Sequence, residues 1–293
     1  MTKSRNYKKV LCFITALIMT TAAYGCTQKK TETDKNTEDT ISIESATQIK
    51  GAVSSLFSER DLNPQFDTVS AEIILSGDTV TVNGNGAVAD GSVVTVSQAG
   101  VYHISGKLTD GKIIVNAPKE KVQLVLDNAD ISCSYSSAIH IENCDKTFLT
   151  LAENSVNTLS DGSEYSTDGQ ENSPDAVIFS EDSLTINGTG SLTVNGNYCD
   201  GIHGKDDIVL TGGIITVNAV EDGIKGKDYV AAADGEFIIN AGCDGIKSTN
   251  SEDEGMGFVF VENGKFTITS GNDGIQAETE FTATGGEFDI VSG

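Results

Sequence analysis

Three short segments repeat an aspartate, a glycine, an isoleucine and a basic residue in the same order: CDGIHGKDD, EDGIKGKDY and CDGIKSTNS. Their aspartates, Asp200, Asp222 and Asp244, are 22 residues apart along the chain, which indicates a structural period. If the repeats stack, neighbouring carboxylates lie about 5 Å apart and repel by roughly 3 to 4 kcal/mol at an effective dielectric constant of about 20. A calcium ion would relieve this repulsion, because it binds several carboxylate oxygens and can bridge adjacent turns.

A fourth copy of the motif, NDGIQAETE, begins 29 residues after the third, because the polar stretch 250–257 enlarges one loop. Further carboxylates follow the motif at the next corner, and the SEDE sequence of the enlarged loop either adds oxygen ligands or is a solvated insertion. The competing interpretation is that each aspartate caps backbone N–H groups at its own corner while nearby cations balance its charge. No histidine pair or cysteine cluster has zinc spacing, so a transition metal is not expected. The candidate calcium ligands are Asp200, Asp222, Asp244, Asp273, Asp206, Asp207 and Asp228.

The basic residue after each motif isoleucine points outward if the isoleucine points into the core, since side chains alternate along a strand. A column of cations beside calcium-bound carboxylates would hold the carboxylates of uronic-acid chains, and charge balance against the aspartates is the alternative role. The chain has no Trp and only 6% aromatic residues, so acidic or soluble glycans are expected to bind better than crystalline cellulose. The candidate carbohydrate-binding residues, including two tyrosines for stacking on sugar rings, are His203, Lys225, Lys247, Lys205, Lys227, Tyr198 and Tyr229.

These side chains must be positioned by the three short segments that each 22-residue unit contains. The first segment is apolar, as in IVLT at 208–211, the second follows a glycine and alternates, as in GIITVNA at 213–219, and the third is the motif. Three strands separated by glycine-rich corners predict an all-β fold, a single-stranded parallel β-helix whose equivalent positions align in columns. The expected core columns are Leu192, Ile215, Phe237, Phe266 and Phe288; Val194, Val217, Ile239, Ile268 and Ile290; and Ile202, Ile224, Ile246 and Ile275.

Other features of the repeat region lead to further expectations. Asn195, Asn218 and Asn240 follow the second segment and are expected to form a ladder of side-chain amides. Apolar residues at helical spacing between positions 49 and 57 predict a short helix that covers the first turn. The polar stretch 163–175 is expected to be a long loop. The sequence ends at GGEFDIVSG, within a turn, which indicates a fragment or a last turn supplied by something else.

The composition suits a globular, turn-rich protein of one large or two ordinary domains, with 293 residues, 38% apolar content, 31 Gly and 3 Pro. The formal net charge of −24 disfavours binding to nucleic acid or anionic lipid. Cys199 and Cys243 hold the same repeat position two turns apart, about 9.6 Å, which exceeds the reach of a disulfide. Free thiols are therefore predicted for these two, whereas pairing of Cys133 with Cys144 is left open.

The first 25 residues have the pattern of an export signal, with four basic residues before the apolar run VLCFITALIMTTAAYG. This run is too short for a convincing membrane span. Cys26 follows small residues and precedes a polar stretch, which resembles a bacterial lipoprotein box and predicts lipidation of Cys26, although Ala23 stands where such boxes usually carry Leu. Ordinary secretion and an uncleaved anchor are the alternatives. The predicted organisation is a signal peptide at 1–25, a polar tether at 26–47 and the β-helix at 48–293, on an extracellular, cell-surface lipoprotein that contacts the membrane only through its lipid anchor.

Several segments together resemble a family of exported clostridial carbohydrate-binding proteins. They are RDLNPQFD at 60–67, AGVYHISGKLTDGKIIV at 99–115, KVQLVLDNADI at 121–131 and LTINGTGSLTVNGNYCDGI at 184–202, followed by the later motif copies. The resemblance runs from about residue 55 to residue 293. It implies a right-handed parallel β-helix similar in architecture to pectate lyases, and an association with cellulose, acidic sugars and bound calcium.

The leading hypothesis is a non-catalytic, calcium-assisted carbohydrate-binding protein of the cell surface that favours acidic polysaccharides. The first alternative is a calcium-dependent polysaccharide lyase in which Lys225 or Lys247 removes the proton beside the uronate carboxylate. The uniform repeats argue against it, because no turn departs into a catalytic constellation. The second alternative is a rigid, acidic surface spacer without a small ligand. No oligomeric state is predicted.

Overall fold

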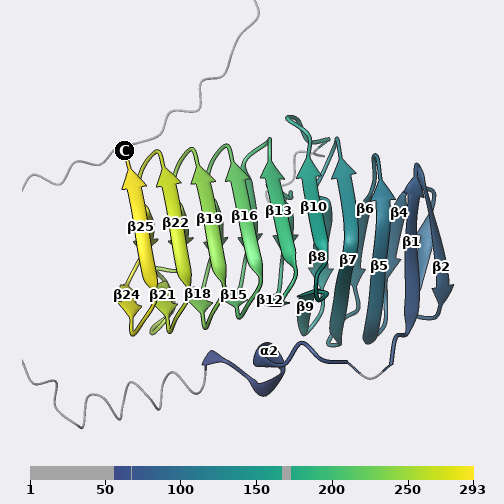
Figure 1. The fold of residues 1–293 in the computed structure, drawn as a ribbon, viewed down its shortest axis with the longest axis horizontal. Coiled ribbons are helices and arrows are strands. Elements are labelled where there is room, and N and C mark those ends of the chain that lie inside the picture. The colour runs from purple at the N-terminus through teal and green to yellow at the C-terminus, as the bar shows by residue number, and fades with distance from the viewer. Residues whose placement is uncertain (1–55, 67, 167–172) are drawn as a thin grey trace, which may run out of the picture. The chain divides into compact units, whose positions relative to one another are not determined.

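The structure is a computed structural model that describes residues 56–66, 68–166 and 173–293. Within these ranges the chain is built almost entirely of strands in two sheets, preceded by the short helix α2 (Glu59–Leu62) (Figure 1). The predicted signal peptide, the tether with Cys26, and all but the last two residues of the predicted capping helix lie outside the described residues. No helix in the described ranges is long and apolar enough to cross a membrane.

The larger sheet has 16 strands and the smaller sheet has nine. The larger sheet contains β1 (Ala71–Gly77), β2 (Thr79–Gly84), β5 (Gly100–Leu108), β7 (Lys121–Cys133), β9 (Lys146–Leu151), β10 (Val156–Asp161), β12 (Ser183–Gly188), β13 (Ser191–Gly196), β15 (Asp207–Leu210), β16 (Ile214–Ala219), β18 (Tyr229–Ala232), β19 (Glu236–Ala241), β21 (Phe258–Val261), β22 (Lys265–Ser270), β24 (Glu280–Ala283) and β25 (Glu287–Ser292). The smaller sheet contains β3 (Ala87–Asp90), β4 (Val93–Val96), β6 (Lys112–Asn116), β8 (Ile139–Asn143), β11 (Ala176–Ser180), β14 (Asp200–Gly204), β17 (Ile224–Gly226), β20 (Ile246–Ser248) and β23 (Ile275–Ala277).

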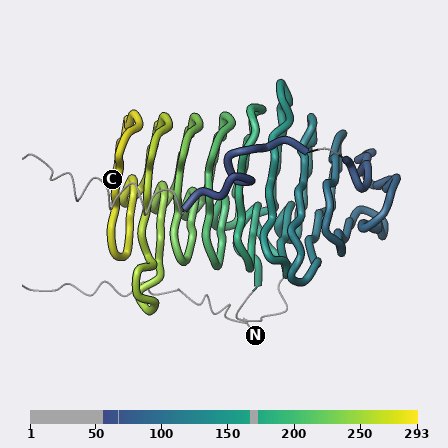
Figure 2. Tube along the Cα trace, turned by 90° about the horizontal axis from the view of Figure 1, so that it is seen from below, coloured from purple at the N-terminus to yellow at the C-terminus, as the bar shows by residue number. Residues whose placement is uncertain are grey.

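From β8 to β22, every strand pairs in parallel with the strand three positions later in the chain, as β12 does with β15 and β14 with β17. Three consecutive strands therefore form one unit, which we call a rung, and the rungs β12–β14, β15–β17, β18–β20 and β21–β23 stack on one another. Figure 2 shows these units as successive loops of the chain trace. The arrangement is that of long parallel sheets, as in a β-solenoid, and confirms the predicted all-β class and three-segment repeat.

The strand register confirms the three predicted core columns. In the second strands, for example, Ile215 pairs with Phe237 and Phe237 pairs with Phe266. In the third strands, Ile202 pairs with Ile224, and the same position continues through the later rungs. The members of these columns are buried except in the last rungs, and each fully buried apolar side chain of this size stabilises the fold by about 1.5 to 3 kcal/mol. The repeat is thus held together mainly by its inward columns.

The motif glycine is required because successive rungs approach each other closely at this corner. A Cβ atom added at Gly223 would lie 2.5 Å from the carbonyl oxygen of Gly245 and 2.5 Å from Ile239 Cγ2. These distances are shorter than real Cβ contacts, and the atoms in the way belong to the backbone and the packed core. A side chain at this position would therefore push two rungs apart.

The predicted amide ladder is present at the end of the second strands. Asn218 Nδ2 donates to Asn195 Oδ1, and Asn240 Nδ2 donates to Asn218 Oδ1, each at 3.0 Å. The cysteines Cys133, Cys144, Cys199 and Cys243 are all free thiols, which confirms the prediction for the two repeat cysteines and answers the open question about the other pair.

Residues 56–66, which we call the strap, lie along the outer side of the larger sheet (Figures 1 and 2). Helix α2 within the strap begins with a capping box, in which Asp61 N–H donates to Ser58 Oγ (3.2 Å) and Ser58 N–H donates to Asp61 Oδ2 (2.8 Å). Thr185 of β12 donates to Asp61 Oδ1 (2.6 Å), and Lys146 Nζ of β9 lies 3.0 Å from the same atom. The strap is therefore fixed to the rungs through a buried carboxylate.

The prediction that residues up to Phe57 cover the first turn is wrong for the described residues. Phe57 instead packs against Val209, Ala231 and Phe260 of β15, β18 and β21. These strands carry apolar side chains on their outer side as well as their inner side, and the strap removes them from water. At the first strands the sheets end in the antiparallel pairs β1–β2 and β3–β4.

Candidate functional site

The strands β14, β17 and β20 bring the repeated aspartates into one column. Asp200, Asp222 and Asp244 are only 1, 5 and 4% exposed. The backbone N–H of Asp222 donates to Asp200 Oδ1 (2.9 Å), and that of Asp244 donates to Asp222 Oδ1 (3.0 Å). Asp273, which is exposed, donates its N–H to Asp244 Oδ1 in the same way (3.0 Å). The aspartates therefore do cap backbone N–H groups. Each N–H group belongs to the next rung, however, and not to the aspartate's own corner.

The other carboxylate oxygen of each aspartate faces the basic residues of the motif. Lys225 Nζ lies 3.1 Å from Asp200 Oδ2 and 3.8 Å from Asp222 Oδ2. Lys247 Nζ lies 3.4 Å from Asp222 Oδ2 and 2.6 Å from Asp244 Oδ2. Acids and cations therefore alternate, so that each cation offsets the repulsion between two carboxylates. We call this alternating set the charge ladder; its members are Asp175, His203, Asp200, Lys225, Asp222, Lys247 and Asp244.

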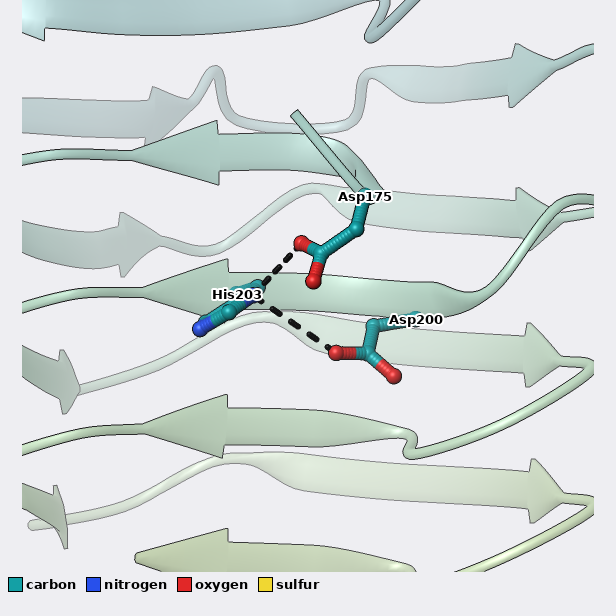
Figure 3. Close-up of side chains that lie close together, drawn as sticks. All are labelled: Asp175, Asp200 and His203. Carbon is teal, nitrogen blue, oxygen red and sulfur yellow. Dashed lines mark hydrogen bonds and ion pairs between the residues drawn. The ribbon is translucent and has the colours of Figure 1, made fainter. Parts of the chain in front are cut away.

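His203 lies between two carboxylates at the first end of the charge ladder (Figure 3). Its Nδ1 atom is 2.6 Å from Asp175 Oδ1 and 3.6 Å from Asp200 Oδ2. Ligand atoms of the three residues lie within 4.8 Å of one another, a spacing at which they could hold a metal ion. The donor set includes an imidazole, however, whereas calcium is bound by oxygen atoms. This group therefore fits calcium less well than a group of carboxylates alone.

Burial and charge together determine the protonation of the charge ladder. Burial raises the pKa of Asp200 to about 6; Lys225 opposes this rise, and the carboxylates of Asp175 and Asp222 add to it. Burial acts to lower the pKa of Lys225, but the charges of the neighbouring aspartates outweigh burial and the pKa lies above its usual value. The pKa of Lys247 is raised against burial in the same way. Both lysines are therefore protonated at neutral pH and paired with carboxylates.

A second group of carboxylates, which we call the acidic corner, consists of Asp182, Asp206, Asp207 and Asp228. Asp206 and Asp228 follow the third strands of successive rungs, and the backbone N–H of Asp228 donates to the carbonyl of Asp206 (3.2 Å). Burial raises the pKa of Asp206, and the charges of Asp228, Asp207 and Asp182 raise it further. No cation of the described residues forms an ion pair with the Asp206 carboxylate. This repulsion is what a bound cation would relieve.

Three members of the acidic corner have partners of their own. Asp182 Oδ2 accepts from the backbone N–H of Cys144 (2.8 Å). Ser183 Oγ donates to Asp207 Oδ1 (2.5 Å), and Lys146 Nζ lies 3.7 Å from Asp207 Oδ2. Asn250 Nδ2 donates to Asp228 Oδ1 (2.6 Å) and also to Asp253 Oδ2 (2.9 Å), which anchors the enlarged loop to the rung before it. Among the described residues, the buried Asp207 Oδ2 accepts no hydrogen bond and the Asp206 carboxylate has no partner, so these oxygens are available to a cation.

The flanking lysines have different surroundings. Lys205 Nζ lies 3.3 Å from Glu181 Oε2 and 5.5 Å from the ring centroid of Phe179. Lys227 is exposed, at the position after β17 that Lys205 holds after β14. Each directly follows a strand of the smaller sheet.

The two predicted stacking tyrosines are separated from each other. Tyr198 stacks on Tyr165 with ring centroids 4.4 Å apart. Tyr229 stacks on Phe258 at 4.9 Å and packs against the apolar cluster beneath the strap. Tyr229 therefore belongs to the larger sheet, whereas the charge ladder is carried by the smaller one.

Sequence reasoning did not identify Asp182 as a candidate ligand. Asp182 directly precedes β12, just as Asp206 and Asp207 directly precede or begin β15 and Asp228 directly precedes β18. An acidic residue at the start of the first strands β12, β15 and β18 was the available signal. This pattern is harder to recognise than the motif, because the motif aspartates have a stricter spacing.

Comparison with known proteins gives three findings. A family model described as carbohydrate-binding domain-containing protein matches residues 90–293. A relative from Acetivibrio thermocellus with the same description is 39% identical over 154 residues, which are 52% of this chain and 54% of the relative, so the match spans about half of the relative's length. A solved structure described as the polysaccharide lyase-like protein from C. thermocellum, gadolinium derivative, is similar with a TM-score of 0.69 and 33% identity, covering 76% of this chain and 94% of that chain.

Proposed function

The chain belongs to the family of carbohydrate-binding domain-containing proteins, and we propose that it binds acidic polysaccharides without cleaving them, with the assistance of calcium. The observation that carries the proposal is the gathering of cations on one sheet of a protein whose formal net charge is −24. The strands β14, β17 and β20 pair in register and so align His203, Lys225 and Lys247. Lys205 directly follows β14, and Lys227 directly follows β17. The positive charge along this sheet would attract a uronic-acid chain, although Lys225 and Lys247 are themselves paired with aspartates.

Calcium is proposed to bind at the acidic corner. In the charge ladder, one oxygen of each buried aspartate accepts a backbone N–H and the other faces an ammonium group, so an ion there would have to displace a lysine. The acidic corner offers oxygen atoms alone, and the Asp206 carboxylate has no ion-pair partner among the described residues. Carboxylate-only donor sets suit a hard cation such as calcium. When bound there, calcium would supply positive charge next to Lys205 and Lys227.

The calcium proposal is tested by thermal unfolding with calcium and with a chelator. Binding to the folded state alone stabilises it by about 2.7 kcal/mol at a free concentration of 100 times Kd. We expect a calcium-dependent rise in Tm that Asp206→Asn and Asp228→Asn abolish. Asp289→Asn, which removes an exposed carboxylate on β25, is the matched control and should leave the rise unchanged. The absence of any rise at millimolar calcium would contradict a calcium site.

The second candidate function is that of a polysaccharide lyase, which the description of the solved relative favours. A lysine that removes a proton near neutral pH needs a lowered pKa. The pKa values of Lys225 and Lys247 are instead raised by their aspartates, which makes these two unsuitable as bases. Incubation with polygalacturonate and calcium separates the functions. A lyase would release unsaturated products that absorb ultraviolet light, whereas a binding protein would be retained on the polysaccharide without product, and a spacer would do neither.

The location of the protein is part of the same proposal. The export signal and Cys26 support a lipoprotein displayed on the cell surface. The right-handed sense of the β-helix is a separate proposal, which is supported by the resemblance to the clostridial family. Mass spectrometry of the N-terminal peptide tests the anchor. Cys26→Ser should release the protein from the membrane fraction, whereas a lipid-free mature N-terminus in the unaltered protein would show ordinary secretion.

A further inference from the structure

A cavity of about 240 Å³ lies on the smaller sheet, one to two rungs before the charge ladder. Its walls come from β6, β8, the residues between β7 and β8, and residues between β10 and β11. They include Lys112, Tyr135, Ser136, His140 and Glu142, together with Tyr165, Ser166, Ser173 and Pro174. The volume is below the roughly 300 to 1,000 Å³ of pockets that take drug-sized ligands. It suits a single sugar ring, with the rest of a chain outside the cavity.

Lys112 differs from the lysines of the charge ladder because no carboxylate pairs with it among the described residues. Its Nζ atom lies 3.4 Å from Ser136 Oγ and 5.7 Å from the centroid of the Tyr135 ring. A ligand carboxylate could engage Lys112 without breaking an existing ion pair. At Lys225 or Lys247, the same ligand would compete with buried aspartates that would be left unpaired.

The local charge also favours an anion. Burial lowers the pKa of His140 to about 4, and the charges of Lys112 and Lys205 lower it further. His140 is therefore neutral near pH 7, and the charged groups with the largest effect on it are cations. Among the described residues that line the cavity, Glu142 is the acidic one; its Oε1 lies 3.7 Å from His140 Nδ1, and its Oε2 accepts from Asn116 Nδ2 (3.0 Å).

The remaining walls match the other surfaces of a sugar. Tyr135 supplies an aromatic ring, on which the C–H face of a sugar can pack. Ser136, His140 and Glu142 supply a hydroxyl, an imidazole and a carboxylate within one cavity, and these groups can exchange hydrogen bonds with sugar hydroxyls. A column of rings connects the cavity to the charge ladder, because His140 contacts Phe179 (5.5 Å between centroids) and Phe179 contacts His203 (5.3 Å).

We propose that this cavity is the subsite that recognises one carboxylated sugar residue, with Lys112 binding the carboxylate and Tyr135 packing against the ring. The inference rests on the proposed function. It differs from the prediction made from the sequence, in which the lysines after the motif isoleucines bind the uronate. Those lysines hold the rungs together, whereas Lys112, which has no carboxylate partner among the described residues, can discriminate between acid and neutral sugar.

The test is calorimetric titration with trigalacturonate and with its methyl ester, which has the same length without the charges. Loss of a hydrogen bond to a charged group weakens binding by about 10-fold to 100-fold. We expect Lys112→Gln to weaken the binding of trigalacturonate by this factor and to leave the affinity for the ester unchanged. Lys112→Arg should restore most of the affinity for trigalacturonate. Lys107→Gln is the control, since Lys107 is exposed and pairs with Asp130 outside the cavity.

A labelling experiment on the unaltered protein covers the case in which a variant does not fold. Trigalacturonate should protect Lys112, but not Lys107, from acetylation of its amine, as measured by mass spectrometry. Unchanged affinity of a folded Lys112→Gln, or equal acetylation of Lys112 with and without the sugar, would overturn the subsite and leave the proposed function standing. Equal affinity of the unaltered protein for acid and ester would overturn recognition of the carboxylate, and binding of neither sugar would overturn the proposed function together with the subsite.

Discussion

Replacing Lys225 by methionine removes one cation from the charge ladder and keeps an unbranched side chain that is one atom shorter. Lys225 Nζ lies 3.1 Å from Asp200 Oδ2 and 3.8 Å from Asp222 Oδ2. At an effective dielectric constant of about 20, each contact corresponds to about 4 to 5 kcal/mol of gross attraction. Removing one partner of a buried pair costs about 3 to 5 kcal/mol, because the other charge stays buried and unpaired. Because the lysine is 22% exposed, solvent screens part of this cost. We therefore expect the free energy of unfolding of Lys225→Met to be about 3 kcal/mol lower near neutral pH, at the lower end of the range.

The pH dependence of this loss follows from the pKa of Asp200, which burial raises to about 6. An unfolded aspartate has a pKa of about 3.9, so the folded protein holds this proton more tightly than the unfolded chain does. Ionisation of Asp200 therefore reduces stability as the pH rises from about 4 through about 6. Without Lys225, the ionised form of Asp200 is still less stable relative to the protonated form. The deficit of Lys225→Met should be largest above pH 7 and should shrink as the pH falls toward about 4.

The assay is equilibrium unfolding in urea followed by circular dichroism, since the chain has no Trp to report by fluorescence. Lys107→Met is the matched control, because Lys107 Nζ lies only 2.6 Å from Asp130 but the two side chains are 62% and 38% exposed. Exposed pairs are worth about 0 to 1 kcal/mol, so this variant should be close to the unaltered protein. Equal effects of the two replacements, or a deficit that grows on acidification, would refute the role of burial in the charge ladder.

Three further changes test other parts of the structure. Gly223→Ala places a Cβ atom 2.5 Å from the carbonyl oxygen of Gly245 and should lower the free energy of unfolding by about 1 to 3 kcal/mol in urea titrations. Asn218→Leu removes two amide hydrogen bonds of 3.0 Å and should cost about 1 to 2 kcal/mol in the same assay. Burial acts to raise the pKa of Asp61, but hydrogen bonds, first that from Thr185, outweigh it and the pKa is lowered. Its stabilisation is therefore present above about pH 4 and lost as the pH falls through the folded pKa, so Asp61→Asn should lower Tm at neutral pH but not in strong acid.

Much of the core could be predicted because each rung contacts only its neighbours. A fixed spacing then places equivalent residues in one column, so Ile202, Ile224 and Ile246 are buried together whatever the rest of the chain does. The same logic predicted the amide ladder and the placing of motif aspartates beside motif lysines. It could not predict which oxygen of Asp200 meets Lys225, since that depends on side-chain rotamers and not on the period.

The strap and the cavity could not be predicted from the spacing of the repeat. Asp61 and Thr185 are 124 residues apart in the chain, and their contact depends on the shape and charge of a surface that several rungs build together. Lys112, Tyr135 and His140 likewise meet only because β6, the turn before β8 and β8 itself are adjacent in the smaller sheet. The sequence by itself determined the periodic core, because nearest-neighbour stacking converts spacing into contact. Only the tertiary structure decided which cations are neutralised by buried aspartates and which, like Lys112, have no carboxylate partner among the described residues, because that depends on where individual side chains end in space.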